Sequence, residues 1–244
     1  MIYELYYWPT AQGRGEFVRL ALEEGCAQYR DVARESGKGA GIAAMMRTLN
    51  DRAVERPPLA PPFLKAGRLL IGQTANILQF LGPRHGLAPR TEAGRLWTHQ
   101  LQLTIADFVV EIHDTHHPVA GSLYYEDQKK EARRRAADFV QNRAPKFLGY
   151  FEKVLAQSAS GKRFMLGAQL TYADLSMFQV MAGLSYAFPN AMRNAARKYP
   201  RLFALHSRIQ ERPRIAAYLA SPRRIPFNNE GIFRYYPELD ASRD

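Results

Sequence analysis

Residues 61–81 read PPFLKAGRLLIGQTANILQFL, and the periodicity of this stretch changes once. Two short apolar runs, at 63–65 and 69–71, flank a link of hairpin length that contains a glycine, which predicts two paired strands. From residue 73 onward the apolar residues recur at helical spacing: Ile77, Phe80 and Leu81. The stretch therefore predicts strand, turn, strand and helix, and we expect Gly82-Pro83 to end the helix.

The start of this helix is a candidate binding site. A helix that begins at Gln73-Thr74 points free backbone N–H groups and a partial positive charge at whatever lies ahead of it. A carboxylate is the ligand that such a helix start favours. An ordinary strand-to-helix turn with a Gln-Thr cap is the alternative interpretation of the pair.

The stretch resembles the segment that holds glutathione in the cytosolic glutathione transferases, which have a proline, a hairpin and then a helix starting with Glu/Gln-Ser/Thr. Pro62 and Gln73-Thr74 match that pattern without a gap. The resemblance implies a cis-proline at Pro62, with Pro61 meeting the cysteinyl part of glutathione through its backbone. It also implies that Gln73 and Thr74 bind the γ-glutamyl carboxylate and amine, and that Trp8 is a glutathione-binding residue.

A second motif lies at the N-terminus. Residues 3–8 read Tyr-x-Leu-x-Tyr-aromatic, and Gly-Arg-Gly-Glu follows at 13–16. This resembles the tyrosine-type transferases, and the family we expect is tyrosine-type and bacterial-like, with Tyr7 at the catalytic tyrosine position and Arg14 at the arginine of the Gly-Arg-Ala-Glu segment. Because the chain carries one extra residue between Tyr7 and Gly13, Thr10 is the alternative if the enzyme is of the serine type. A packed tyrosine at the end of a strand is the other interpretation of Tyr7.

The chemistry that this resemblance implies needs a hydroxyl donor. A thiol with a pKa near 8.5 is a good nucleophile only as the thiolate. Lowering that pKa by about two units requires ~2.7 kcal/mol of preferential thiolate stabilisation. One charge-assisted hydrogen bond contributes roughly 1.5–3 kcal/mol. A single Tyr7 hydroxyl is therefore sufficient as a donor to sulfur, with Arg14 assisting by its charge.

The pattern of residues 1–83 predicts a small α/β domain. We expect a strand at 3–7, a helix that buries Phe17, Leu20 and Ala21, a strand at 29–33 and a helix at 42–49. With the hairpin and the last helix the order is βαβ, α, ββα, which the resemblance identifies as thioredoxin-like. Cys26 follows the first helix, and we interpret it as a buried packing residue.

Residues 84–90 have the composition of a linker, and residues 91–244 are helical by pattern with an irregular tail. The expected fold class is thus an α/β thioredoxin-like N-terminal domain plus an all-α helical C-terminal domain. One long helix should bury Leu101, Ile105, Phe108, Val109 and Ile112 and end by Pro118, and a second helical segment should span 128–155. Thr171 to Asp174 predicts a capping box, and it resembles the buried capping motif of the transferase helical domain. The tail, 221–244, is too apolar to hang free, so we expect it to pack on the body, at the cleft mouth or on the first domain.

Three histidines lie close together, at His113, His116 and His117. The i,i+4 pair His113 and His117 could share a helix face and bind a metal. Beyond Asp114 no further ligand is evident from the sequence, so we expect no metal site.

Composition restricts the partners and the compartment. The formal net charge is +11, but Lys and Arg are scattered along the chain, so a nucleic-acid partner is not favoured. The single cysteine fits a reducing compartment, the first residues resemble a strand more than a signal peptide, and no run is long enough for a membrane span. We expect a cytoplasmic protein with no membrane partner.

The leading hypothesis is a homodimeric glutathione transferase that uses glutathione as co-substrate and attacks a small hydrophobic electrophile with the glutathione thiolate. A non-catalytic, transferase-shaped binding or scaffold module is the alternative. Two departures from the family pattern stand out. The aspartate that many relatives contribute from a partner subunit corresponds to a position near His99, and only charge suggests Lys38 or Lys65 as ligands of the glycyl carboxylate.

Overall fold

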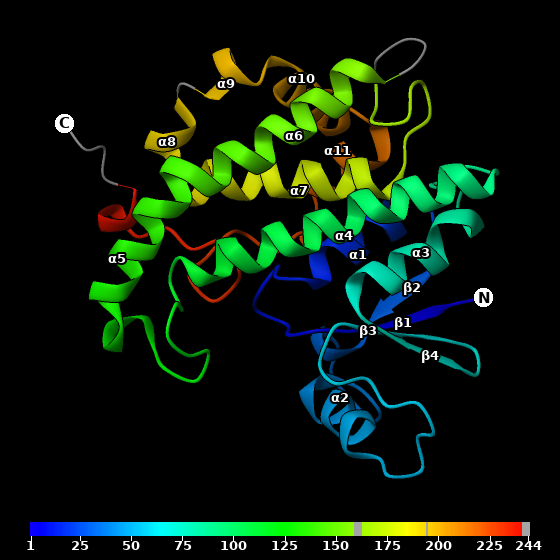
Figure 1. Cartoon of the computed structure of the whole chain (residues 1–244). Helices are drawn as coiled ribbons and strands as arrows, with labels where there is room; N and C mark the ends of the chain where they lie inside the picture. Colours follow the sequence, from blue (N-terminus) through cyan, green and yellow to red (C-terminus); the bar gives the residue numbers. More distant parts are fainter. Residues whose placement is uncertain (159–162, 194, 241–244) are drawn as a thin grey trace.

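The computed structural model describes residues 1–158, 163–193 and 195–240, and its N-terminal part is built on a four-stranded sheet (Figure 1). The strands are β1 (Tyr3–Tyr6), β2 (Tyr29–Asp31), β3 (Phe63–Ala66) and β4 (Leu69–Gly72). Their order in the sheet is β2-β1-β3-β4, with β1 parallel to β2 and β3 antiparallel to both of its neighbours. The predicted order βαβ, α, ββα is confirmed.

Helices cover both faces of the sheet. The helices α1 (Gly15–Glu24) and α3 (Thr74–Arg84) lie on the face toward the helical part, and α2 (Gly41–Asn50) lies on the other face (Figure 1). Alternation along β1 explains this division, because successive side chains of a strand point to opposite faces. Leu5 packs with residues of α1 and α3, whereas Tyr6 packs with residues of α2.

Two expected boundaries are wrong. The strand expected over residues 29–33 ends at Asp31 and continues as a 3-10 turn, because Val32 and Ala33 are consecutive and both bury their side chains in the same cluster. Helix α3 does not end at Gly82-Pro83 but runs to Arg84. A Cβ at Gly82 would lie 2.7 Å from the Tyr172 ring, so this glycine allows a close helix contact. The glycine that ends the helix is Gly86, at φ +70°.

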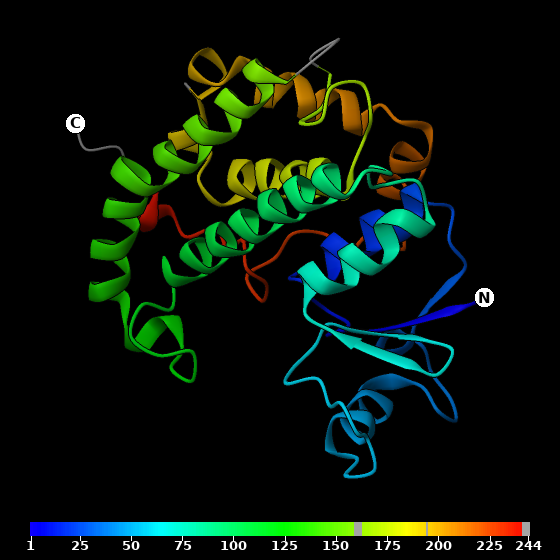
Figure 2. The same ribbon diagram turned by 45° about the vertical axis from the view of Figure 1, so that its right-hand side comes forward.

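The rest of the described chain is mainly helical (Figure 2). Its longer helices are α4 (Glu92–Asp114), α5 (Lys129–Asp138), α6 (Ala144–Gln157), α7 (Tyr172–Ala187) and α10 (Pro200–Gln210). Its shorter ones are α8 (Pro189–Arg193), α9 (Ala195–Lys198) and α11 (Pro213–Leu219). The expected helical segment at 128–155 is α5 and α6 joined by a π-helical turn, Phe139–Arg143. Helix α4 ends at Asp114, four residues before Pro118.

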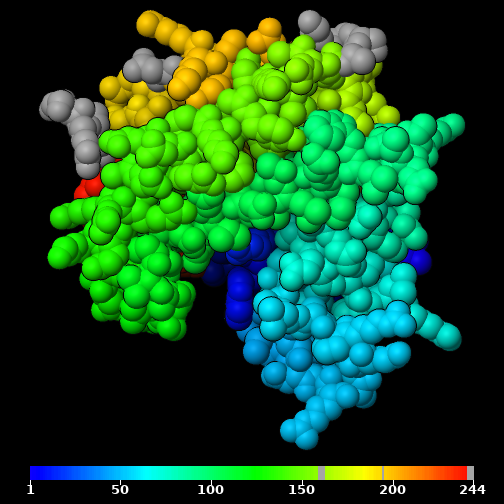
Figure 3. Space-filling model, viewed as in Figure 1, coloured from blue at the N-terminus to red at the C-terminus, as the bar shows by residue number. Residues whose placement is uncertain are grey.

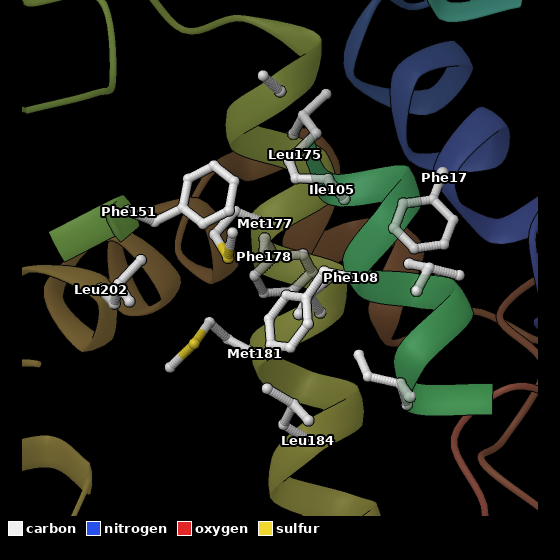
Figure 4. Packing of buried hydrophobic residues seen from close by; sticks show 14 of the residues in the cluster. Phe17, Ile105, Phe108, Phe151, Leu175, Met177, Phe178, Met181, Leu184 and Leu202 are labelled. Atoms are coloured by element: carbon white, nitrogen blue, oxygen red, sulfur yellow. The ribbon is translucent and has the colours of Figure 1, made fainter. Parts of the chain in front are cut away.

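Helix α7 is the centre of the helical part. Its residues are apolar on nearly every side, as expected for a helix surrounded by other elements. It packs against α4, α10 and α1. Figure 4 shows its Phe178 beside Phe108 of α4, with Phe17 of α1 and Leu202 of α10 on opposite sides of this pair. One continuous core therefore joins the first helix to the helical part.

The predicted capping box at the start of α7 is confirmed. The Asp174 carboxylate is fully buried and accepts hydrogen bonds from the Thr171 backbone N–H at 2.8 Å, the Thr171 hydroxyl at 2.7 Å and the Met165 N–H at 2.8 Å. Burial raises the pKa of Asp174 to about 6, although these donors oppose the shift. The box fixes α7 and the preceding loop to each other.

A buried ion network joins α1 to β2, α11 and the tail. Glu16 and Arg19 are fully buried and lie 3.2 Å apart, and Arg19 also bonds Asp31 of β2 at 2.7 Å. Glu16 accepts further hydrogen bonds from the Tyr218 hydroxyl of α11, at 2.6 Å, and from Arg224 of the tail. Burial lowers the pKa of Arg19, but the carboxylates of Glu16 and Asp31 outweigh it and the net shift is upward.

The expectation that the tail packs on the body is confirmed over its described residues. The tail runs from α11 along α4 toward α5 (Figure 2). Ile225, Ile232 and Phe233 are buried. Gln12 donates to the Ile225 carbonyl and Asn228 donates to the Thr10 carbonyl at 2.8 Å, so the tail covers the loop after β1. Residues 241–244, its last part, lie outside the described residues.

Among the described residues, no helix combines the length and the apolarity that a bilayer crossing requires.

We predict that Asp174→Ala lowers the free energy of unfolding by about 3 kcal/mol or more, because each buried donor left without an acceptor costs about 1–3 kcal/mol. The midpoint of thermal unfolding should fall by roughly 6–12 °C. The matched control is Thr91→Ala, which removes the exposed cap of α4 and should cost only about 0.5 kcal/mol. Equal losses in the two variants, measured by urea unfolding, would contradict the structural role of the buried box.

Candidate functional site

The register of the sheet brings the predicted residues to one end of three adjacent strands. Tyr6 of β1 pairs with Phe63 of β3, and Phe63 pairs with Gly72 of β4. Continued by one residue beyond the strand ends, these antiparallel registers would place Tyr7 opposite Pro62, and Pro62 opposite Gln73. Residues separated by more than fifty positions in the sequence are therefore neighbours at this edge.

Tyr7 is held by the backbone of the loop that follows it. Its side chain is 7% exposed, and its hydroxyl oxygen accepts a hydrogen bond from the Arg14 backbone N–H at 2.9 Å. Burial raises the pKa of Tyr7, although the Arg14 N–H and the charges of Arg14 and Arg19 oppose the shift. The phenol thus keeps its proton, and because the oxygen already accepts from Arg14, the O–H remains available as a donor.

Two glycines allow this contact. A Cβ at Gly13 would lie 1.9 Å from the Tyr7 hydroxyl oxygen, and a Cβ at Gly15 would lie 2.5 Å from Cγ of the ring. Gly13 also has φ +43°, a region that side chains other than glycine disfavour. The Gly-Arg-Gly spacing is therefore what lets the loop close over the tyrosine.

The proline and the helix start lie as the motif requires. The Pro61-Pro62 peptide bond is cis. Gln73 has φ +67°, a left-handed conformation that non-glycine residues adopt rarely and most often at functional sites. The Thr74 hydroxyl lies 3.5 Å from the Arg14 carbonyl oxygen, so the start of α3 reaches the loop that holds Tyr7. Among the residues that the structure describes, no side chain caps α3.

Other predicted residues are placed differently. Trp8 is 42% exposed, and Thr10 is exposed with its carbonyl bonded to the tail. Lys65 pairs with Glu4 at 3.3 Å, three residues along β3 from Pro62. Cys26 is exposed, so its interpretation as a packing residue is wrong. It lies at φ +50° where the chain leaves α1, and the turn directs its side chain to solvent.

The tail, which the sequence predicted to pack on the body, forms the wall beside this sheet end; its contact with the histidines was not predicted. A Cβ at Gly231 would lie 3.6 Å from the Gly13 backbone nitrogen, and the Ile232 carbonyl contacts His116 after the end of α4. The tail thus connects the loop after Tyr7 to the histidines. Figure 3 shows a hollow between the green helical atoms and the cyan and blue N-terminal atoms, with residues of the blue N-terminal segment at its base.

Besides burial, positive charges on the loop after β1 and on the tail lower the pKa of a histidine at the end of α4. Burial, the neighbouring His117 and the positive charges of Arg14 and Arg234 lower the pKa of His113 to about 4. Burial also raises the pKa of Asp114. The end of α4 therefore presents neutral imidazoles toward the loop that carries Arg14.

The fold and the site define a two-part protein in which an α/β sheet places a protonated tyrosine, a cis-proline and a helix start beside a helical wall. Residues 113–222 match the family model described as "Glutathione S-transferase, C-terminal domain". A glutathione S-transferase of Plasmodium falciparum is 23% identical over 222 residues, covering 89% of this chain and 94% of that protein. A glutathione S-transferase P of Bos taurus is 26% identical over 241 residues, covering 94% and 98%.

A solved structure, the Pi-class glutathione S-transferase of Onchocerca volvulus, superposes with a TM-score of 0.68 at 21% identity, covering 90% of this chain and 92% of that one. This likeness confirms the predicted fold class, a thioredoxin-like domain followed by an all-α domain. The chain is thus similar to glutathione S-transferases over most of its length, at 23% and 26% identity to these two relatives.

We predict that Gly15→Ala lowers the free energy of unfolding by about 1–3 kcal/mol, because the added methyl group overlaps the Tyr7 ring and forces a shift. Gly149→Ala is the matched control, since a Cβ there meets no atom of the described structure within 4 Å. In the interior of α6 that change should be neutral or stabilising by up to about 1 kcal/mol. Chemical unfolding of both variants checks the contrast, and a Gly15→Ala protein as stable as Gly149→Ala would rule out the close contact.

Proposed function

We propose that this protein is a glutathione transferase that binds glutathione as co-substrate and activates its thiol as the thiolate for attack on an apolar electrophile. The observation that carries the proposal is Tyr7, a protonated phenol whose oxygen accepts from the Arg14 N–H. It lies at the same sheet end as the cis Pro61-Pro62 bond and the start of α3. The relatives named glutathione S-transferase support the same activity.

In this mechanism Tyr7 donates its hydroxyl proton in a hydrogen bond to the glutathione sulfur. A donor whose pKa is raised keeps its proton while the thiol loses its own, so Tyr7 stabilises the thiolate and does not act as the base. The Arg14 guanidinium has no hydrogen-bond or ion-pair partner among the described residues. Its positive charge therefore lowers the free energy of a nearby anion. The proposed tyrosine type rests on Tyr7. The relatives named above come from eukaryotes, so the expectation of a bacterial-like transferase stays a prediction.

The glutathione backbone would lie along the sheet end. Gln73 and Thr74 begin α3, whose free N–H groups and partial charge favour the γ-glutamyl carboxylate. Pro61 precedes the cis bond and offers its carbonyl oxygen but no N–H to the cysteinyl part. Trp8 is sufficiently exposed to contact the bound molecule. The proposed glutathione-binding residues are Trp8, Pro61, Pro62, Gln73 and Thr74.

The electrophile would enter the hollow between the two parts, against the end of α4 and the tail. The buried side chains of Ile232 and Phe233 join the hydrophobic core and so hold the tail in this position. We also propose a cytoplasmic homodimer, as expected from the resemblance. The alternative, a non-catalytic module that only binds glutathione, predicts retained binding without turnover on a panel of electrophiles.

We predict that Gln73→Ala and Thr74→Ala each weaken glutathione binding by about 10- to 150-fold, because each removes a hydrogen bond to a charged group worth roughly 1.5–3 kcal/mol. Titration calorimetry measures both affinities. Thr104→Ala is the matched control, since this half-buried threonine on α4 bonds only its own helix, to the Gln100 carbonyl. Unchanged affinity in both variants would remove the start of α3 from the site.

We predict that Tyr7→Phe preserves the fold and most of the glutathione affinity but lowers turnover by about 10- to 150-fold. The pH profile of turnover should also move to higher pH, because the thiolate then forms only near the ordinary thiol pKa of about 8.5. The ultraviolet absorbance that the thiolate gains on adding glutathione separates activation from binding.

Tyr6→Phe is the control for this change. Tyr6 points to the opposite face, where its ring stacks on Phe63 and its hydroxyl donates to Glu4, so its loss should leave turnover and pH profile unchanged. A Tyr7→Phe enzyme with wild-type turnover and an unmoved profile would exclude the donor role, and Thr10 would be the next residue to change.

A further inference from the structure

Three histidines converge where α4 ends. His113 lies in the last turn of the helix, and His116 and His117 follow it, their backbone N–H groups both bonding the His113 carbonyl at 3.2 Å. Every pair of the three rings has centroids between 4.7 and 5.0 Å apart. One nitrogen from each ring lies within 4.8 Å of the other two. Helical spacing alone would bring together only His113 and His117. The tight turn after α4 adds the His116 imidazole to this pair.

The tail fixes which nitrogen of His116 faces the cluster. His116 is 1% exposed, and its Nε2 lies 2.8 Å from the Ile232 carbonyl oxygen. A carbonyl only accepts, so Nε2 carries the hydrogen and Nδ1 has the lone pair. Nδ1 is the atom that faces His117, at 2.5 Å from its Nδ1. A histidine that donates one N–H to a backbone carbonyl and turns the other nitrogen inward has the arrangement of a metal ligand.

The cluster is close to the size that a metal ion requires. Two nitrogens at the Zn–N distance of a tetrahedral site are about 3.3 Å apart, so the His116–His117 pair must open by roughly 0.8 Å, within the motion of side-chain torsions on a loop. The lone pair on His116 Nδ1 follows from the geometry, because Nε2 donates to the Ile232 carbonyl.

Charged residues around the three histidines affect the binding of a cation in opposite directions. Arg14 and Arg234 act on the cluster as positive charges and weaken the binding of a cation. Glu126 acts on His117 with the opposite sign. Asp114, the one further ligand that the sequence suggested, is not among the grouped residues of the described structure. The site would therefore have three nitrogen ligands and no carboxylate.

We propose that His113, His116 and His117 form a zinc site in which the tail, through the Ile232 carbonyl, orients the buried ligand. Three imidazoles with a fourth position left to water or another exogenous ligand are a known zinc donor set. Imidazole also suits copper and nickel, which geometry and availability would select against. The proposal stands independently of the proposed transferase activity, because it rests on the histidines and the tail alone.

The test is zinc titration of the full chain after chelator treatment, with glutathione and thiol reductants left out because thiols bind zinc. We expect one zinc ion per chain for the wild type. His113→Ala and His117→Ala should each weaken binding by more than about 100-fold, since loss of even an outer-shell partner costs 10- to 100-fold. Cobalt(II) provides a second readout, because a tetrahedral site gives strong visible absorption that both variants should lose.

Two controls separate this site from adventitious binding. His99→Ala removes a histidine on the same helix but outside the cluster, and Cys26→Ser removes the exposed thiol. Both should bind zinc as the wild type does. Zinc at 100 times the dissociation constant should also raise the midpoint of thermal unfolding by roughly 5–10 °C in the wild type and both controls, but not in His113→Ala. Equal zinc affinity in wild type and His113→Ala, or loss of binding in Cys26→Ser, would overturn the proposal.

Discussion

The buried pair Glu16–Arg19 is the interaction on which the arrangement of the two parts depends. Both side chains are fully removed from water, so each requires compensation for its charge. Asp31 of β2, Tyr218 of α11 and Arg224 of the tail supply it. Removing one partner of a buried ion pair costs about 3–5 kcal/mol, because the other charge is left unpaired. The network therefore fixes α1 relative to the sheet, the helical part and the tail at once.

This fixed helix determines the site. The loop before α1 contains Gly13, Arg14 and Gly15, and it closes over the Tyr7 ring because the two glycines have no side chains. The Arg14 N–H then holds the phenol oxygen while leaving its proton available. Movement of α1 relative to β1 would break this contact. The chemistry proposed for Tyr7 thus depends on this buried network, whose Arg19 guanidinium lies 5.9 Å from the centre of the Tyr7 ring.

The tail joins the two sides of the hollow. It contacts the loop after β1 through Ile225, Asn228 and Gly231, and it contacts the end of α4 through Ile232. The wall that an electrophile would meet and the carbonyl that orients His116 therefore belong to one segment. Any change that displaces this segment should affect both the loop that holds Tyr7 and the histidine cluster. The tail couples the proposed substrate side to the proposed zinc site.

The sequence by itself determined the order of the elements in the α/β part and the capping box of α7. It also supplied the candidate site residues Tyr7, Arg14, Pro62, Gln73 and Thr74. Hydrophobic period, helix caps and local motifs can be read from the sequence because they are properties of neighbouring residues. The sequence misplaced Cys26 and the end of α3, where a left-handed turn and a close helix contact outweigh local pattern. Only the tertiary structure decided that Tyr7, Pro62 and Gln73 follow paired residues at one end of the sheet, that Tyr218 and Arg224 complete the Glu16 network, and that the tail orients His116. These residues lie from 11 to 208 positions apart in the sequence. Strand register and burial bring them together, and no local sequence pattern encodes either one.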